Sequence, residues 1–235
     1  TLKKWLTRFK TYDKVKKFGW SGYVIDAAIV THPDDDHIGG FVHILEDLQA
    51  GKLYDICFNC FWVNHPTKHE FVPNDVQRIQ TQKSLDARLK CVYNYKEDSK
   101  KNLLDLIDSV GIARTEVFAG DYLDEPQITI ISPTRDFYES LLPKFRNKLN
   151  FHWALEALEE NSYSSKDDIS DETTLSKTLD DATDDTSAHN QSSIVFLLET
   201  DEKQKFLFTG DAGRDAFNHV PQTLLGKVKD VTWMK

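Results

Sequence analysis

Four side chains that can bind a metal ion lie close together in the first fifth of the sequence. His32, Asp34, Asp36 and His37 supply two imidazoles and two carboxylates within six residues, in the segment 31–40, which reads THPDDDHIGG. Imidazole nitrogens and carboxylate oxygens are both common ligands of divalent metals. We therefore expect these four side chains to converge on a metal, while Asp35 points away from it.

The neighbouring sequence favours a strand, a loop and a helix around these side chains. Residues 23–30 are rich in β-branched and apolar side chains, and residues 41–45 continue with helical spacing. We expect the histidines and aspartates on a loop at the strand end, where side chains can converge instead of alternating across a sheet. Gly39 and Gly40 would let the helix approach this loop closely.

The acidic segment has two other interpretations besides a metal site. A solvated loop could place its carboxylates near the N-terminus of the next helix, where negative charge is favourable. An EF-hand calcium loop fits less well, because counting from Asp34 puts Ile38 where an oxygen ligand is needed. The metal site is the favoured interpretation.

The rest of the chain alternates between expected strands and helices. Strands are expected at 53–63, 127–131 and 228–234, with a hairpin at 193–198 and 205–209. Helices are expected at 75–89, at 99–110, from a Thr134 cap through Leu142, and at 215–225. Residues 156–187 are crowded with acidic and hydroxyl side chains, which is typical of a mobile insertion. We expect one α/β (α+β) domain over 1–235 with this insertion inside it.

Composition narrows the class of protein. The formal net charge of −9 argues against a generally basic nucleic-acid-binding surface, without excluding a nucleic-acid substrate. Three cysteines in 235 residues make a poor disulfide framework, so we expect a cytoplasmic protein. Cys57 and Cys60 lack the second pair of a zinc ribbon and are expected to be buried thiols. No apolar run approaches the ~20 residues that cross a membrane, so no membrane insertion is expected.

The pattern Thr-His-x-x-x-Asp-His-x-Gly-Gly resembles the signature loop of the metallo-β-lactamase superfamily. Its His-x-Asp-x-Asp-His form, with Asp34 where most members have histidine, is similar to the hydrolase domain of bacterial DNA-uptake competence channel proteins. Asn190-Gln191-Ser192-Ser193 and Thr209-Gly210-Asp211 resemble two further motifs of these relatives, in the same order. The resemblance implies a four-layer αββα fold. We expect it to be truncated at both ends, because the family's opening Gly-rich strands are not found and its His-His-Gly-Ser motif would follow Lys235.

The resemblance also implies a centre with two divalent metal ions. His32 and Asp34 would serve one ion, Asp36 and His37 the other, and Asp211 would bridge them. Asp36 and Asp211 are the expected catalytic residues, with Asp36 orienting the attacking water. Asp34, with Asn190 near the usual third histidine position, makes the centre oxygen-rich, which favours manganese or magnesium without excluding zinc. Further candidates are His189, adjacent to Asn190, and Thr31, which opens the motif.

A metal-dependent hydrolase of a phosphodiester, either a nuclease or a nucleotide phosphodiesterase, is the function that the resemblance implies. The alternatives are a metallohydrolase of a small ester, amide or thioester, and a catalytically silent binding scaffold. Five basic residues are expected to form a solvated face more than a backbone-binding cleft: Lys83, Arg88, Lys90, Lys100 and Lys101. His65 and His69 are expected at the surface. With one ligand expected beyond Lys235, we expect this chain alone to be weakly active or inactive.

Overall fold

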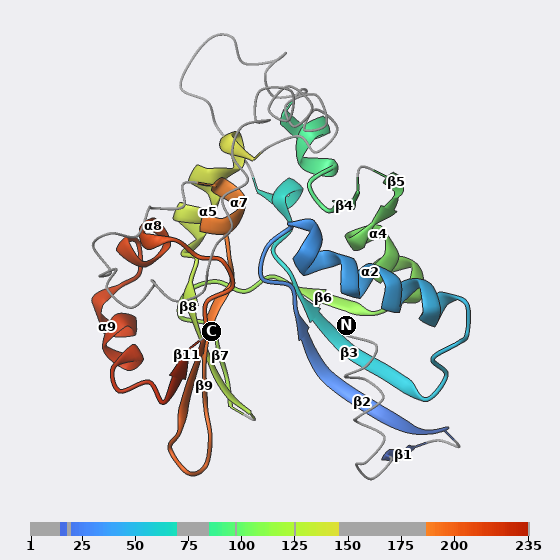
Figure 1. The fold of residues 1–235 in the computed structure, drawn as a ribbon, viewed down its shortest axis with the longest axis horizontal. Helices are drawn as coiled ribbons and strands as arrows, with labels where there is room; N and C mark the ends of the chain where they lie inside the picture. Colours follow the sequence, from blue (N-terminus) through green and yellow to red (C-terminus); the bar gives the residue numbers. More distant parts are fainter. Residues whose placement is uncertain are drawn as a thin grey trace, which may run out of the picture.

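The computed structural model describes residues 15–17, 20–69, 85–96, 98–124, 126–145 and 187–234. Within these ranges the strands form a four-stranded sheet, a five-stranded sheet and a two-stranded ribbon, accompanied by helices (Figure 1). The expected mixture of helices and sheets is therefore confirmed. The expected acidic insertion, except Ser187, lies outside the described residues. So do residues 75–84 of the helix expected at 75–89, whereas residues 85–90 are helical.

The first sheet has the strand order β1-β2-β3-β6. Its strands are β1 (Val15–Lys17), β2 (Trp20–Ile29), β3 (Ile56–Trp62) and β6 (Ala113–Thr115). β2, β3 and β6 are parallel, with helix α2 (Asp35–Gln49) between β2 and β3 and helix α4 (Leu103–Val110) before β6. The carboxyl ends of these three strands therefore lie at one edge of the sheet.

The second sheet has the order β11-β10-β9-β8-β7. Its strands are β7 (Tyr122–Leu123), β8 (Gln127–Ser132), β9 (Val195–Glu199), β10 (Lys205–Phe208) and β11 (Trp233–Met234). β9 and β10 are an antiparallel hairpin, so the residues before β9 and after β10 lie at the same end. At that end the Ile194 N–H donates to the Thr31 carbonyl over 2.9 Å, which joins the second sheet to the end of β2.

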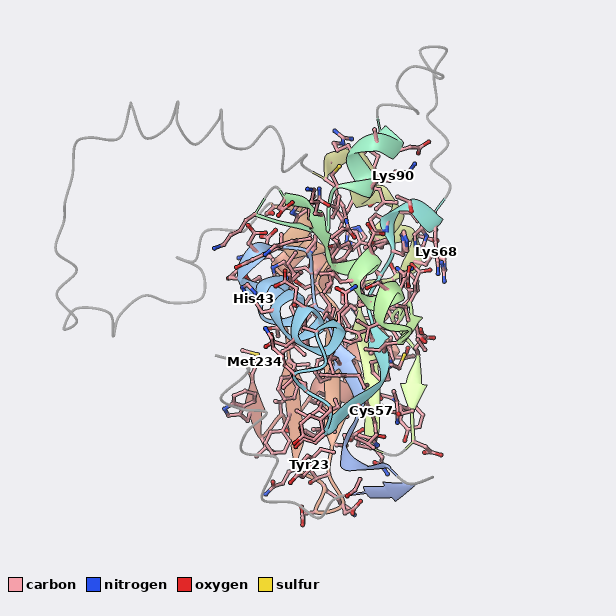
Figure 2. All side chains as sticks on the ribbon, turned by 90° about the vertical axis from the view of Figure 1, so that its right-hand side faces the viewer. Tyr23, His43, Cys57, Lys68, Lys90 and Met234 are labelled. Carbon is pink, nitrogen blue, oxygen red and sulfur yellow. The ribbon has the colours of Figure 1, made fainter. Side chains whose placement is uncertain are left out.

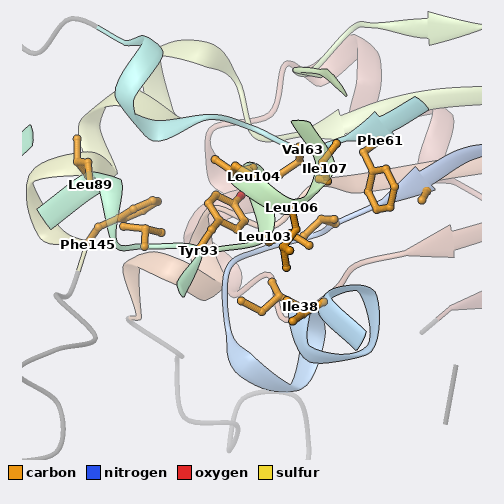
Figure 3. Packing of buried hydrophobic residues seen from close by; sticks show 14 of the residues in the cluster. Ile38, Phe61, Val63, Leu89, Tyr93, Leu103, Leu104, Leu106, Ile107 and Phe145 are labelled. Atoms are coloured by element: carbon orange, nitrogen blue, oxygen red, sulfur yellow. The ribbon is translucent and has the colours of Figure 1, made fainter. Parts of the chain in front are cut away.

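Apolar side chains fill the space between the two sheets and cover the outer face of each. The cluster between the sheets includes Ile29, Trp62, Ile128, Ile130, Phe196 and Leu198. Outside the first sheet, α2 and α4 contribute Ile38 and Ile107 to a cluster that also contains Phe61 of β3 and Val63, which follows that strand (Figure 3). Outside the second sheet, Phe217 of α8 (Arg214–Asn218) and Leu224 of α9 (Gln222–Leu225) cover Val195, Leu197 and Leu207.

Two expected helices differ from the observed ones for local reasons. The helix expected at 99–110 begins at Leu103, because residues 98–102 form β5 and pair with β4 (Asn94–Tyr95). The Asn102 side chain then caps α4 by accepting the N–H groups of Leu104 and Asp105. The helix expected at 215–225 is divided into α8 and α9 by Pro221, which has no N–H to continue a helix.

Two expected strands are shorter in the structure, and one expected helix cap is present. β3 begins at Ile56, because residues 53–55 form a turn. Of the strand expected at 228–234, the structure shows only β11, since Gly226–Val228 form a 3-10 turn. The Thr134 cap is confirmed, because its side chain accepts the Phe137 N–H at the start of α5 (Arg135–Leu141).

The prediction of buried thiols is wrong for Cys57, which is exposed, while Cys60 and Cys91 are half-buried. Alternation along β3 buries Ile56 and Phe58 and turns Cys57 to the opposite face of the strand. In Figure 2, Cys57 lies in the lower half of the molecule, and Lys68 and Lys90 lie in the upper half. The thiol therefore lies away from the carboxyl ends of β2, β3 and β6.

Candidate metal centre

The expected metal ligands come together where three segments of the chain meet. His32 follows β2, Asp211 follows β10, and His189 lies in the short helix α7 (Ala188–Gln191) that precedes β9. The hairpin of β9 and β10 delivers His189 and Asp211 to the same end, where the Ile194–Thr31 hydrogen bond attaches them to β2. The sheet topology thus gathers residues that are far apart in the sequence.

The acidic histidine segment is more helical than expected. α2 begins at Asp35, so Asp36 and His37 occupy its first turn instead of a loop, and Asp34 is the extended N-cap. Carboxylates in a first turn are favourable beside the positive end of the helix macrodipole. Asp34, however, makes no side-chain cap hydrogen bond. Helix capping therefore does not account for the direction of the Asp34 carboxylate.

Three of the expected ligands form a compact group. His32 Nε2 and His37 Nε2 lie 3.7 and 3.4 Å from Asp211 Oδ2, and the two imidazole centroids are 4.0 Å apart. One ligand atom from each residue lies within 4.8 Å of the other two, and this is the only such group found in the described ranges. Two atoms bound to one tetrahedral zinc ion are roughly 3.3 Å apart. The observed distances are close to that separation.

Each histidine of the group also has its own aspartate neighbour. Asp34 Oδ2 is 3.9 Å from His32 Nε2, and Asp36 Oδ2 is 3.7 Å from His37 Nε2. Asp36 has an 80% exposed side chain, so this side of the centre faces solvent. Asp35 accepts a hydrogen bond from the Lys96 N–H instead. Asp34, Asp36 and Asp211 thus face the histidines, and Asp35 does not.

His32 is held as a neutral imidazole. Its burial, and then the nearby His37 ring, lower the pKa of His32 to about 4, although Asp34, Asp211 and Asp36 oppose the shift. His32 Nδ1 lies 3.2 Å from Thr31 Oγ1 and 3.1 Å from Ser193 Oγ, whereas its Nε2 is buried and has no hydrogen-bond partner among the described residues. An unsatisfied buried polar atom costs about 1–3 kcal/mol, and a cation at Nε2 would remove that cost.

Two hydroxyl groups and one glycine support the histidines. Thr31 Oγ1 lies 3.1 Å from His37 Nδ1 as well, so one hydroxyl contacts both rings. Gly210 has a φ of +53°, and a Cβ there would lie 3.0 Å from Thr31 Cβ and 3.1 Å from Ser193 Oγ. The turn that delivers Asp211 therefore packs directly on the supporting hydroxyls. Sequence reasoning did not assign Ser193 to the site, although the Asn-x-x-Ser motif contained it.

A third histidine, His189, contacts Asp34 of the segment 31–40. Its Nδ1 is 2.8 Å from Asp34 Oδ1, and its ring packs edge-on against Phe145 with centroids 4.9 Å apart. The backbone carbonyl of Asn190 accepts a hydrogen bond from the Ser193 N–H. The structure therefore places His189, the alternative to Asn190, beside the expected ligand Asp34.

Other candidates lie elsewhere. The expected surface position is wrong for His69, whose 2% exposed side chain bonds Glu116 and Glu139, while His65 is half-buried. Gly39 makes room for Tyr95 and not for the segment 31–40, because a Cβ there would lie 2.5 Å from Tyr95 Cε2.

The basic residues expected on a solvated face differ in their contacts. Arg88 donates a hydrogen bond to the Pro143 carbonyl, and Lys101 forms an ion pair with Glu46. Lys90 and Lys100 are exposed, and Lys83 is outside the described residues.

Comparisons of the chain with protein families, with curated proteins and with solved structures find no match. Among the helices of the described residues, none is long and apolar enough to cross a membrane.

Proposed function

We propose that the chain is a metal-dependent hydrolase with the four-layer αββα fold of the metallo-β-lactamase superfamily. Two facing sheets with helices on their outer faces support the fold. The observation that carries the function is the buried His32 Nε2. It belongs to a neutral imidazole, has no hydrogen-bond partner in the ranges that the structure describes, and lies 3.7 Å from Asp211 Oδ2. A divalent cation is the partner that this nitrogen and the neighbouring carboxylates could bind in common.

We propose that the centre holds two ions. His32 and Asp34 would hold one ion, His37 and Asp36 the other, with Asp211 between them, since its Oδ2 lies within 3.7 Å of both histidines. Aspartate at position 34 makes the first site rich in oxygen. We propose manganese or magnesium as the preferred metals, with zinc as the alternative.

A phosphodiester is the substrate class that we propose. Two ions a few ångströms apart activate water and neutralise charge on the attacking and leaving oxygens of an in-line displacement. Within the chain, Asp36 is the exposed carboxylate beside His37 and is suited to orient water and accept its proton. Thr31 keeps both imidazole rings in place. We propose a nucleic acid or a nucleotide as the substrate and the cytoplasm as the location, which the free cysteines support.

Metal-dependent turnover tests the proposal. The 235-residue chain would be loaded with Mn²⁺ and assayed on bis(4-nitrophenyl) phosphate, single-stranded DNA, a cyclic nucleotide and 4-nitrophenyl acetate. We expect weak phosphodiester cleavage that EDTA removes and that Asp36→Asn reduces, while Asp35→Asn, its neighbour outside the centre, leaves it unchanged. Cleavage of the acetate alone would favour a small-ester hydrolase. Failure to retain manganese, zinc or magnesium would overturn the enzyme proposal and favour a silent scaffold.

A further inference from the structure

The two carboxylate oxygens of Asp34 face different partners. Oδ1 is 2.8 Å from His189 Nδ1, and Oδ2 is 3.9 Å from His32 Nε2. Asp34 lies at the N-cap of α2, yet its side chain does not cap the helix. A hydrogen bond at Oδ1 restricts rotation of the carboxylate and keeps Oδ2 on the His32 side. The conformation of Asp34 is thus set by His189 more than by its own helix.

The His189 ring has one well-supported orientation. Its side chain is 8% exposed, and Phe145 packs edge-on against it. The carbonyl of His189 accepts the Ser192 hydroxyl over 2.6 Å, which fixes the backbone that carries the ring. Nε2 is buried without a hydrogen-bond partner in the described part of the chain, so Nδ1 makes the polar contact of this ring.

The contact between His189 and Asp34 differs in length from those in the metal group. At 2.8 Å it is a hydrogen bond, and because an ionised carboxylate only accepts, Nδ1 carries the proton and donates. The histidine–carboxylate contacts of His32 and His37 measure 3.4 to 3.9 Å, which is too long for strong hydrogen bonds and suited to atoms that share an ion. His189 therefore behaves as a donor to a ligand.

We infer that His189 is a positioning residue, which holds the Asp34 carboxylate for the metal through Nδ1–H and itself stays outside the coordination sphere. The inference rests on the proposed metal centre. Partners of this kind orient a ligand and raise its basicity, and their loss typically weakens metal binding about 10- to 100-fold. Two ligands at right angles on one octahedral ion would also be roughly 2.9 Å apart. The test must therefore separate a donor from a ligand.

Three substitutions separate the two roles. His189→Asn places an amide N–H near the position of Nδ1, His189→Gln reaches toward the position of Nε2, and His189→Ala removes both. Co²⁺ is the probe, with affinity measured by titration and the coordination sphere by visible absorption, after circular dichroism has confirmed folding. We expect about a 10- to 100-fold loss of affinity for Ala and Gln. We expect His189→Asn to bind within a few fold of the natural chain, with an unchanged Co²⁺ spectrum.

Several results would overturn the assignment. Retained binding in His189→Gln but not in His189→Asn would make Nε2 a metal ligand. A changed Co²⁺ spectrum in His189→Asn would place Nδ1 in the coordination sphere. Natural affinity in all three variants would remove any role for His189. If the unsubstituted chain bound neither Co²⁺ nor Mn²⁺, the proposed metal centre would fail first, which distinguishes that failure from an error about His189. If His189→Ala does not fold, the Asn and Gln pair decides alone.

Discussion

Two histidine–carboxylate clusters lie near the same edge of the first sheet, and they are built in opposite ways. In the proposed metal centre, His32 and His37 lie 3.4 to 3.9 Å from carboxylate oxygens, and their Nδ1 atoms face hydroxyl groups. In the second cluster, which we term the Glu-His-Glu clasp, His69 Nε2 lies 2.9 Å from Glu116 and Nδ1 lies 2.8 Å from Glu139. In the first cluster the histidine Nε2 atoms are thus open, without a carboxylate at hydrogen-bond length, whereas in the clasp both nitrogens of His69 have one.

This difference determines the charge of each histidine. Burial lowers the pKa of His32 to about 4 and leaves a neutral ring with a buried Nε2. Burial also acts to lower the pKa of His69, but the hydrogen bonds to Glu116 and Glu139 outweigh it and raise that pKa. A neutral ring with an open nitrogen suits a metal, whereas a ring with a carboxylate at each nitrogen joins Glu116, which follows β6, to Glu139 of α5. Geometry distinguishes the two roles, and composition does not.

The largest effect is expected from removing a ligand of the metal centre. Asp211→Ala should weaken Mn²⁺ binding more than the ~10- to 100-fold that an outer-shell change costs, because Asp211 lies near both histidines. His69→Gln should leave Mn²⁺ affinity within about threefold, since both nitrogens of the clasp are already bonded. Isothermal titration measures both. Equal losses of Mn²⁺ affinity in the two variants would contradict the different roles of the two clusters.

Gly210→Ala should damage stability and metal binding together. A side chain at its positive φ costs about 1–2 kcal/mol, and the Cβ would also displace Thr31 and Ser193, which support His32. Gly111→Ala is the matched control, because Gly111 has a φ of +77° with nothing within 4 Å of the added Cβ. We expect chemical denaturation to show a loss for both variants, and Mn²⁺ titration to show a loss of about 10-fold for Gly210→Ala alone. Parallel losses of affinity would refute the packing argument.

The clasp should make stability depend on pH. Because folding raises the pKa of His69, its contribution is complete below about pH 6.5, where the unfolded histidine is also protonated, and it is lost as the pH rises through the folded-state pKa. His69→Gln should cost about 1–3 kcal/mol in the acidic part of this range and flatten the decline. Denaturation between about pH 5.5 and 9 checks this. A decline as steep in the variant as in the natural chain would assign it to other groups.

A comparison for this stability loss is His43→Gln, which removes an exposed histidine paired with Glu46. Exposed ion pairs contribute about 0–1 kcal/mol, so we expect a smaller loss than for His69→Gln. A larger loss from the exposed pair would contradict a structural role for the clasp.

The smallest effect is expected for Asp35→Asn. Asp35 lies between metal-centre residues in the sequence but accepts the Lys96 N–H, so its loss should change stability by less than about 0.5 kcal/mol. Mn²⁺ affinity should not change measurably. A tenfold loss of affinity would show that all the acidic residues contribute through their summed charge, without a defined geometry.

The parts of the centre that could be predicted are those whose spacing is local. His32, Asp34, Asp36 and His37 lie within six residues, and the Thr-Gly-Asp motif identified Asp211. The choice of His189 over Asn190 depends on how one turn of α7 meets Asp34, 155 residues away. The clasp gave no signal either, because Glu116 and Glu139 are 47 and 70 residues from His69. Likewise, Asp98–Asn102 becomes a strand only through its pairing with β4.

Anomalous diffraction from crystals of the chain soaked in Mn²⁺ tests the central claim most directly, because it locates the ion. We predict a peak within about 2.3 Å of His32 Nε2 or His37 Nε2 and of Asp211 Oδ2, and no peak at the Glu-His-Glu clasp. A peak at the clasp, or the absence of one beside Asp211 at saturating Mn²⁺, would contradict it.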